Sequence, residues 1–483
     1  MNNIQKDIEN LNLKIDPIFN KNEHDKYIND WRGQYLGNAF AVLKPSNSAE
    51  VSKILKYANK NKMSIVPQGG NTGLCGGATP IKNSNSLIIS TEKLNKIISI
   101  DENSNSITLE SGVILSEIHK QVEQLNLFFP LNLGAKGSCM IGGNLSTNAG
   151  GINVLKYGNT RDLCLGLEVV LPNGEILKLL GDLKKDNTGY DLKNLFIGAE
   201  GTLGIITAAT FKLFPLPKAT LTTFVETSTI SNAINLLNMF QKELPYSIEA
   251  FELTPRVFWE VASNNIDNIS LPFNKTPEMG VLIDISTSSI NDATADSSGS
   301  TPLNEKLETI LSIGHEKGLI SDAIICKNES ERNQLWHIRE SAAESEKKEL
   351  EKSSAIKCLK HDISLPIKNI EKFHIEAQKM IKSTVTGTRT IYFGHLGDGN
   401  LHYNVFGNDK LPDGFGGKSL KITDKLYEIV KSFDGSFSAE HGIGQLRKKS
   451  LMLHKDPVAY SLMKTIKKQF DPNNIMNPEK IFV

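Results

Sequence analysis

The residues best suited to chemistry lie near the C-terminal end of the sequence. Gly394–Asn404 contains His395 and His402, one on each side of a Gly-Asp-Gly turn, and further along Glu440 directly precedes His441. Imidazole and carboxylate groups together suit a divalent transition metal, most often zinc. These residue types therefore predict a metal site with two histidines and Glu440 as ligands and one open position, the pattern of a catalytic zinc site.

The elements around the two histidines must bring them together. We predict strand, turn and strand through Gly394–Asn404, so that two strands carry His395 and His402 to one point. Spacing alone leaves a second interpretation equally open, in which the histidines only form hydrogen bonds within a polar loop, because His-x6-His is not a tight motif.

Three glycine-rich loops occur in the first 205 residues: Gln68–Leu74, Gly134–Gly151 and Ala199–Gly204. Backbone N–H groups in such turns bind phosphate, so the loops together predict one large phosphate-bearing cofactor. Taken singly, each loop could be a tight turn between strands. No G-x-G-x-x-G motif opens a helix after a first strand, which argues against a Rossmann site.

Composition excludes several classes of protein. The 483 residues are 39% hydrophobic and 22% charged, and 54 basic residues balance 54 acidic ones, so we expect no nucleic-acid partner. No apolar run is long enough to span a bilayer, and the N-terminus lacks a leader pattern. The five scattered cysteines form no CxxC pair, which argues against an Fe–S cluster. We expect a cytoplasmic protein; peripheral membrane association or an organelle matrix stays open.

The pattern of elements changes after Pro215 and Pro217. Beyond them, alternating strands and helices predict an α+β domain with helices on one face of an antiparallel sheet. We predict one long charged helix over 329–351. The polar tract 286–304 is predicted to be a mobile surface loop without an assigned role.

A family resemblance rests on these motifs. The second half of the chain, with Gly394–Asn404 and Ser438–Gly444, resembles the C-terminal domain of FAD-linked D-2-hydroxyacid dehydrogenases, and most closely those that act on D-2-hydroxyglutarate. The first half resembles the FAD-binding domain of vanillyl-alcohol oxidase flavoproteins, through Pro67–Leu74, Gly134–Gly151, Lys185–Leu192 and Gly198–Thr207.

The resemblance implies an α+β fold. It has a two-subdomain FAD-binding domain of the vanillyl-alcohol oxidase (PCMH) type, a ferredoxin-like α+β cap domain and a helical C-terminal segment. The expected divisions are an N-terminal lead-in (1–35), the FAD-binding domain (36–217), the substrate or cap domain (218–425) and a segment that returns to the FAD domain (426–483).

The resemblance also implies non-covalent FAD and its binding residues. Those expected to contact FAD are Pro67, Gly69, Gly70, Asn71, Thr72, Gly73, Gly137, Ser138, Gly142, Gly143, Asn144, Thr147, Asn148, Gly150, Gly151, Glu200, Gly201, Gly204, Ile206 and Asn477.

For the reaction, the resemblance implies oxidation of a D-2-hydroxy acid to the 2-oxo acid, with hydride passing to flavin N5. It makes His395, His402 and Glu440 the ligands of a divalent metal, with zinc as the expected ion, Asn404 a substrate contact and His441 the general base. These roles are physically consistent, because a metal lowers the pKa of the hydroxyl group and a neighbouring imidazole takes its proton near neutral pH.

Two cations match family positions that bind substrate carboxylate groups. Arg339 offers the bidentate fork that suits a carboxylate, and Lys360 offers a point charge. Solvated surface charges are the alternative interpretation for both. The position four residues after the arginine, often threonine in the hydroxyglutarate enzymes, is Ala343, which leaves the identity of the acid in question.

D-2-hydroxyglutarate is the favoured substrate, ahead of D-lactate and D-malate. The flavin subunit of a glycolate- or lactate-oxidising complex and a non-catalytic flavin- or metal-binding protein are the alternatives. Without an Fe–S motif, electrons are expected to leave through a protein such as an electron-transfer flavoprotein or through a quinone. The sequence does not fix the oligomeric state, and a homodimer is one option.

Overall fold

The chain folds into two compact units, which we call unit 1 and unit 2. A computed structural model describes residues 2–267, 269, 275–352 and 357–483. Unit 1 comprises Met1–Gly151, Tyr157–Leu216 and Glu440–Val483, and unit 2 comprises Ile152–Lys156 and Pro217–Ala439. Among the described residues, no helix has the length and apolar character needed to cross a membrane.

A small parallel sheet with the strand order β1-β3-β2 begins unit 1. Its strands are nearly continuous apolar runs, as expected when both faces of a sheet are buried. Helix α3 packs Val51, Ile54, Leu55 and Ala58 against it, at the spacing of one helical face. The elements are β1 (Ala39–Leu43), α3 (Ser48–Asn61), β2 (Ile65–Gln68) and β3 (Ser86–Ser90).

A second, antiparallel sheet has the strand order β4-β5-β9-β7-β8. Residues from this sheet form much of the largest hydrophobic core described in unit 1. Its strands are β4 (Ile97–Asp101), β5 (Ser106–Glu110), β7 (Cys164–Val170), β8 (Ile176–Leu179) and β9 (Ile205–Lys212). The other elements described in unit 1 are α1 (Asn2–Glu9), η1 (Lys21–Glu23), α2 (Asp25–Ile28), α4 (Leu115–Glu123), β6 (Leu127–Phe128), α5 (Ile141–Thr147), α7 (Thr160–Leu163), α8 (Lys193–Phe196), β10 (Phe214–Pro215), α17 (Lys448–His454) and α18 (Pro457–Phe470).

Unit 2 is built on one antiparallel sheet with the order β14-β11-β13-β12-β16-β17-β15. Its strands are β11 (Ala219–Thr227), β12 (Ile248–Pro255), β13 (Met279–Thr287), β14 (Asp322–Ile325), β15 (Cys358–Ser364), β16 (Arg389–His395) and β17 (Asn400–Phe406). The helices are α9 (Ile230–Glu243), α10 (Arg256–Asn265), α11 (Ile290–Ala293), α12 (Pro302–Glu316), α13 (Glu329–Glu340), α14 (Ala342–Glu351), η2 (Ile367–Asn369), α15 (Ile370–Thr384), η3 (Pro412–Gly414) and α16 (Ser419–Ser432), while the short α6 (Val154–Tyr157) spans the unit boundary.

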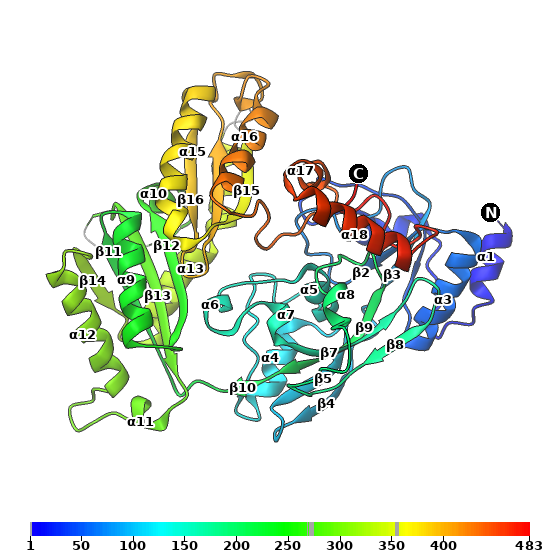
Figure 1. Cartoon of the computed structure of the whole chain (residues 1–483), viewed down its shortest axis with the longest axis horizontal. Coiled ribbons are helices and arrows are strands. Elements are labelled where there is room, and N and C mark those ends of the chain that lie inside the picture. Colours follow the sequence, from blue (N-terminus) through cyan, green and yellow to red (C-terminus); the bar gives the residue numbers. More distant parts are fainter. Residues whose placement is uncertain (1, 268, 270–274, 353–356) are drawn as a thin grey trace. The chain divides into compact units, whose positions relative to one another are not determined.

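Helices cover both faces of this sheet, so the prediction of helices on one face only was wrong. Helix α9 lies against β11 and β12, and α15 and α16 pack against the same core (Figure 1). Alternate strand residues such as Phe224, Leu282 and Phe393 point the other way and are buried against α10, α13 and α14. Successive side chains of a strand point to opposite faces of the sheet. Because these strands carry apolar residues at consecutive positions, they bury side chains on both faces and form two cores.

Two local predictions in unit 2 also change. The helix predicted over 329–351 is two helices, α13 and α14, with Ser341 between them. The tract 286–304 is not a loop throughout, since it contains α11 and the start of α12, where Thr301 accepts the N–H of Asn304 as an N-cap. Polar N-cap residues specify where these helices begin. The sequence prediction missed α11 and the first residues of α12 because the tract has few apolar residues at helical spacing.

Candidate active site

A cavity in unit 1 lies where the three glycine-rich loops meet. It encloses about 910 Å³ of space, part of which is open to solvent. The first loop and its flanks contribute Pro67–Cys75, Gly77 and Ala78, and the second loop contributes residues in and before α5. The third loop contributes Glu200, Gly201 and Gly204, and Ile205 and Ile206 follow it. His441 also lines the cavity. A glycine-walled cavity of this kind suits a dinucleotide cofactor such as FAD.

Most of the residues predicted to bind FAD line this cavity. The exceptions are Gly137, Ser138, Asn148, Gly150, Gly151 and Asn477. Asn477 is buried and donates from its side-chain amide to the carbonyls of Gly77 (3.0 Å) and Glu200 (2.8 Å), so it joins the loops around the cavity. Sequence reasoning did not single out Gln68, Thr91 and Met140, which also line the cavity and carry no phosphate-loop signature.

Close backbone packing explains one glycine of the first loop. A Cβ atom at Gly70 would lie 2.0 Å from the carbonyl oxygen of Ser138, so the first and second loops approach each other only because Gly70 has no side chain. At Gly181, which does not line the cavity, a Cβ atom would meet nothing within 4 Å.

These two glycines make a matched pair for a test of the cavity. Gly70→Ala is expected to lower the flavin content of the purified protein about tenfold, since overpacking of about 1–3 kcal/mol must separate the two loops. Gly181→Ala is the control and should retain its flavin. Flavin absorbance per protein after gel filtration measures both variants; full flavin content in Gly70→Ala would contradict this account of the cavity.

The loop that carries His441 is anchored within unit 1. The carboxylate of Glu200 accepts the N–H groups of Ile443 at 2.7 Å and Gly444 at 2.8 Å, and Arg447 donates to the carbonyl of Gly442 at 2.9 Å. Burial raises the pKa of Glu200, although the hydrogen bonds from Ile443 and Gly444 act to lower it. Glu200 was predicted to contact FAD; its carboxylate holds the His441 loop.

Glu440 has a partner of its own in unit 1. Its Oε1 accepts the N–H of Gly151 at 3.1 Å. Gly151 has a φ of +115°, and a Cβ atom there would lie 2.2 Å from the carbonyl oxygen of Asn132, so the position requires glycine. The second glycine-rich loop therefore ends by binding the predicted metal ligand, beyond the part that lines the cavity.

His395 and His402 lie together on the sheet of unit 2. His395 ends β16 and His402 lies in β17, with their ring centroids 5.8 Å apart. The strand–turn–strand arrangement is as predicted, and Phe393, which pairs with His402, places a ring 5.1 Å from it. Asn404 is two residues after His402 and so projects from the same face of β17.

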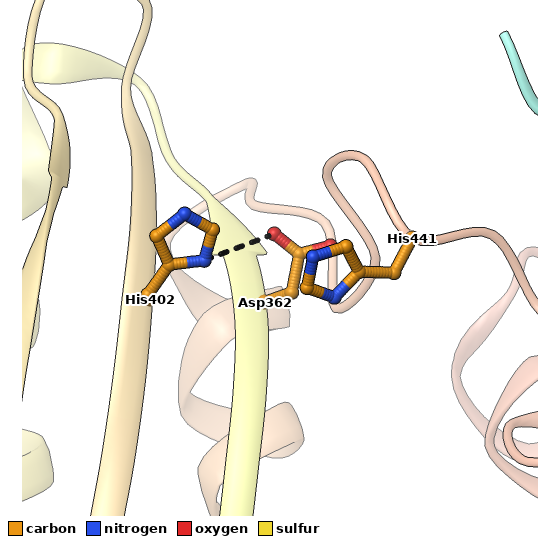
Figure 2. Close-up of side chains that lie close together, drawn as sticks. All are labelled: Asp362, His402 and His441. Atoms are coloured by element: carbon orange, nitrogen blue, oxygen red, sulfur yellow. Dashed lines mark ion pairs between the residues drawn. The ribbon is translucent and has the colours of Figure 1, made fainter. Parts of the chain in front are cut away.

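A buried carboxylate lies near each histidine. His395 Nδ1 lies 2.5 Å from Oε1 of Glu252, the residue opposite it on β12. Burial acts to raise the pKa of Glu252, but the charges of Arg339 and His395 outweigh burial and lower that pKa to about 2. His402 Nδ1 lies 3.9 Å from Oδ1 of Asp362 on the neighbouring strand β15 (Figure 2).

A third carboxylate belongs to the turn between the histidines. Asp398 accepts the N–H of Asn400 at 3.1 Å, which closes the Gly-Asp-Gly turn. Burial raises the pKa of Asp398 to about 6, and the charge of His395 opposes that rise only in part. The two rings therefore stand among carboxylates, an environment that favours a bound cation.

The predicted substrate cations also have carboxylate partners. Arg339 donates from Nε to Oε2 of Glu252 at 2.6 Å, and Lys360 Nζ lies 2.7 Å from Oε2 of Glu346. The amide of Asn404 donates to Oε1 of the same Glu346. The Arg339 side chain is 12% exposed, so Arg339 is not a solvated surface charge, while the paired side chain of Lys360 is 33% exposed and partly solvated.

Sequence reasoning missed the carboxylates Glu252, Glu346 and Asp362. Glu252 carried a usable signal, because it and Glu249 are charged residues within the largely apolar strand Ile248–Pro255, and such residues are rarely buried without a partner. Glu346 lies in a helix rich in charged residues, where nothing in the pattern distinguishes it. His361, by contrast, is buried with Nδ1 bonded to Tyr403 O and Nε2 to Thr423 Oγ1, a structural role.

Two sequence families match the chain. The FAD binding domain family matches residues 39–180, and the C-terminal domain of FAD linked oxidases matches residues 216–481. Among solved structures, p-cresol methylhydroxylase with substrate bound is similar over 100% of this chain and 96% of its own, with a TM-score of 0.74 and 14% identity. This likeness confirms the predicted α+β fold of the vanillyl-alcohol oxidase type.

Curated relatives cover nearly the whole chain. The mitochondrial D-2-hydroxyglutarate dehydrogenase of Arabidopsis thaliana is 37% identical over 455 residues, 94% of this chain and 76% of that protein. The D-2-hydroxyglutarate–pyruvate transhydrogenase DLD3 of Saccharomyces cerevisiae is 33% identical over 484 residues, 97% of this chain and 92% of that protein.

Proposed function

The chain belongs to the FAD-linked oxidases and is an FAD-dependent oxidoreductase, and from that premise we propose that it oxidises D-2-hydroxyglutarate to the 2-oxo acid. The observation that carries the proposal is one face of the unit 2 sheet, where a buried carboxylate lies beside each of two histidines and two cations. The names of its relatives support the choice of acid.

Flavin binding is assigned to unit 1. The glycine-walled cavity, which His441 lines, has the close backbone packing that suits a dinucleotide such as FAD. When bound, FAD supplies the acceptor for the hydride that leaves the substrate carbon. We assign non-covalent binding.

Metal binding is assigned to His395, His402 and Glu440, with zinc as the metal. The donor set fits, since imidazole and carboxylate ligands are typical of zinc and each histidine has a carboxylate beside Nδ1. Ala439, the residue before Glu440, donates its N–H to Asp362 O at 3.3 Å. Glu440 is covalently bonded to Ala439 and must therefore follow it closely in space, which supports Glu440 as the third ligand. When bound, zinc supplies a Lewis acid for the substrate hydroxyl group.

The remaining steps fall to the chain's own residues. His441 takes the hydroxyl proton, a task for which imidazole is suited near neutral pH. Arg339 and Lys360 bind the two carboxylates of D-2-hydroxyglutarate, and Asn404 adds a neutral hydrogen bond. Because Glu252 and Glu346 already accompany these cations, each can stay charged in a partly buried place before the substrate arrives.

Turnover across related acids tests the choice of substrate. With an artificial dye as electron acceptor, kcat/KM for D-2-hydroxyglutarate is expected to exceed that for D-lactate and glycolate about tenfold or more, since one hydrogen bond to a charged group is worth about 1.5–3 kcal/mol. D-malate should rank between them, and L-isomers serve as controls. A preference for D-lactate would replace the substrate assignment, and a colourless protein would remove the flavin chemistry.

The natural electron acceptor is one of two kinds: a redox carrier (a protein or a quinone) or a small 2-oxo acid. An electron-transfer flavoprotein or a quinone suits a chain without an Fe–S motif. The yeast relative named as a transhydrogenase favours pyruvate as a second candidate. Reoxidation of the D-2-hydroxyglutarate-reduced flavin by added pyruvate, followed by absorbance, separates the two: rapid recovery of the oxidised spectrum assigns pyruvate, and an unchanged reduced spectrum assigns a protein or quinone.

A further inference from the structure

One buried carboxylate in unit 2 connects the predicted metal ligand with the predicted substrate cation. Glu252 has a side chain that is 1% exposed. Its Oε1 lies 2.5 Å from His395 Nδ1, and its Oε2 accepts the Nε–H of Arg339 at 2.6 Å. Each oxygen therefore serves a different functional side chain.

Rigid elements hold the three groups in this arrangement. Glu252 and His395 face each other across the β12–β16 pair, so the sheet register fixes their separation. Arg339 comes from α13, and its guanidinium carbon lies 5.0 Å from the centre of the Phe393 ring. That cation–π contact orients the guanidinium plane against the strand that carries His395.

The contact with His395 determines which ring nitrogen faces a metal. With Nδ1–H donated to a carboxylate, the ring takes the tautomer that binds metal through Nε2, and the carboxylate makes the ring a stronger ligand. The hydrogen bond between Glu252 and Arg339 likewise orients the guanidinium group. Glu252 accepts the Nε–H, and this bond fixes the plane in which the terminal amino groups meet a substrate carboxylate.

We propose that Glu252 is a positioning residue that couples metal binding to substrate binding, by orienting His395 toward the metal and Arg339 toward the substrate carboxylate. The inference rests on the proposed function, and it assigns to Glu252 a role that requires no contact with either ligand. A bound metal then stabilises the carboxylate orientation that Arg339 needs, and a bound substrate stabilises the orientation that His395 needs.

A second buried carboxylate in the same sheet provides the matched control. Asp284 on β13 accepts hydrogen bonds from Arg332 at 2.6 Å and from Trp336 at 3.1 Å. Like Glu252 it is a buried strand carboxylate paired with an arginine of α13. Its hydrogen-bond donors are Thr222, Arg332 and Trp336 rather than a histidine of the site, so its loss reports only the structural effect of removing such a pair.

The experiment measures zinc binding and kinetics separately. Flavin-loaded wild type, Glu252→Gln and Asp284→Asn are stripped of metal with a chelator and titrated with Zn²⁺ by calorimetry. We expect Glu252→Gln to raise the Kd for Zn²⁺ about 10–100-fold. At saturating Zn²⁺ its KM for D-2-hydroxyglutarate should rise about tenfold with a smaller change in kcat. In Asp284→Asn, provided that it folds, both constants should stay within about twofold of wild type.

The outcomes distinguish this inference from the proposed function. If wild type binds no Zn²⁺, both the zinc assignment and the coupling fail. If wild type binds Zn²⁺ and Glu252→Gln binds it equally well, the role of Glu252 is refuted and the proposed function stands. Equal losses in Asp284→Asn would also refute it, by reducing the effect to general damage.

A second variant covers the case in which Glu252→Gln does not fold. Arg339→Met removes the donor that fixes Oε2 but leaves Glu252 and His395 in place. Coupling predicts that its Kd for Zn²⁺ rises about fivefold, although Arg339 is not a metal ligand. An unchanged Kd would refute the coupling.

Discussion

Replacement of His441 with alanine is expected to slow turnover about a thousandfold while flavin and zinc stay bound, because a positioned general base contributes about 10²–10⁴-fold. The variant should keep its cofactors, since the loop is held by backbone hydrogen bonds to Glu200 and by Arg447, which do not involve the imidazole. Stopped-flow reduction of the flavin by D-2-hydroxyglutarate measures the effect, and flavin absorbance and metal content verify the cofactors.

Two comparisons make this test specific. Added imidazole should partly restore flavin reduction in His441→Ala, which a variant damaged in its fold would not show. His337→Ala alters an exposed histidine of α13 and should reduce flavin at the wild-type rate. Wild-type reduction by His441→Ala would assign the base to another residue.

Removal of the metal is expected to have an effect of similar size. Dialysis against a chelator should lower turnover about 10²–10³-fold, since Lewis-acid activation of the hydroxyl group is worth several kcal/mol. The flavin spectrum should persist because the FAD cavity is lined by residues other than the proposed metal ligands. Stoichiometric Zn²⁺ should restore the rate.

His402→Ala sharpens the metal test. His402 is the proposed ligand that lies 3.9 Å from Asp362, and its loss should abolish stoichiometric Zn²⁺ binding and leave turnover low whether or not Zn²⁺ is added. An undiminished rate in a metal-free wild type would remove zinc from the mechanism altogether.

Local motifs made much of the site predictable. Glycine-rich loops such as Gln68–Leu74 are contiguous in sequence. Their ability to approach a ligand depends on the backbone freedom of glycine, which is visible in the sequence itself. The turn between His395 and His402 is likewise local, so the strand–turn–strand arrangement follows from residues that are neighbours in the chain. The order of strands in the unit 2 sheet was not accessible in this way.

The sequence by itself determined the residue types proposed for the chemistry: the glycine-rich loops and the histidine pair from their own pattern, and the cations Arg339 and Lys360 through the family resemblance. Only the tertiary structure decided what surrounds them. Glu252 and His395 are 143 residues apart in sequence, yet the β12–β16 register places them side by side. The physical reason is that a buried charge needs a partner, while strand pairing across a large separation leaves no local trace of which carboxylate supplies it.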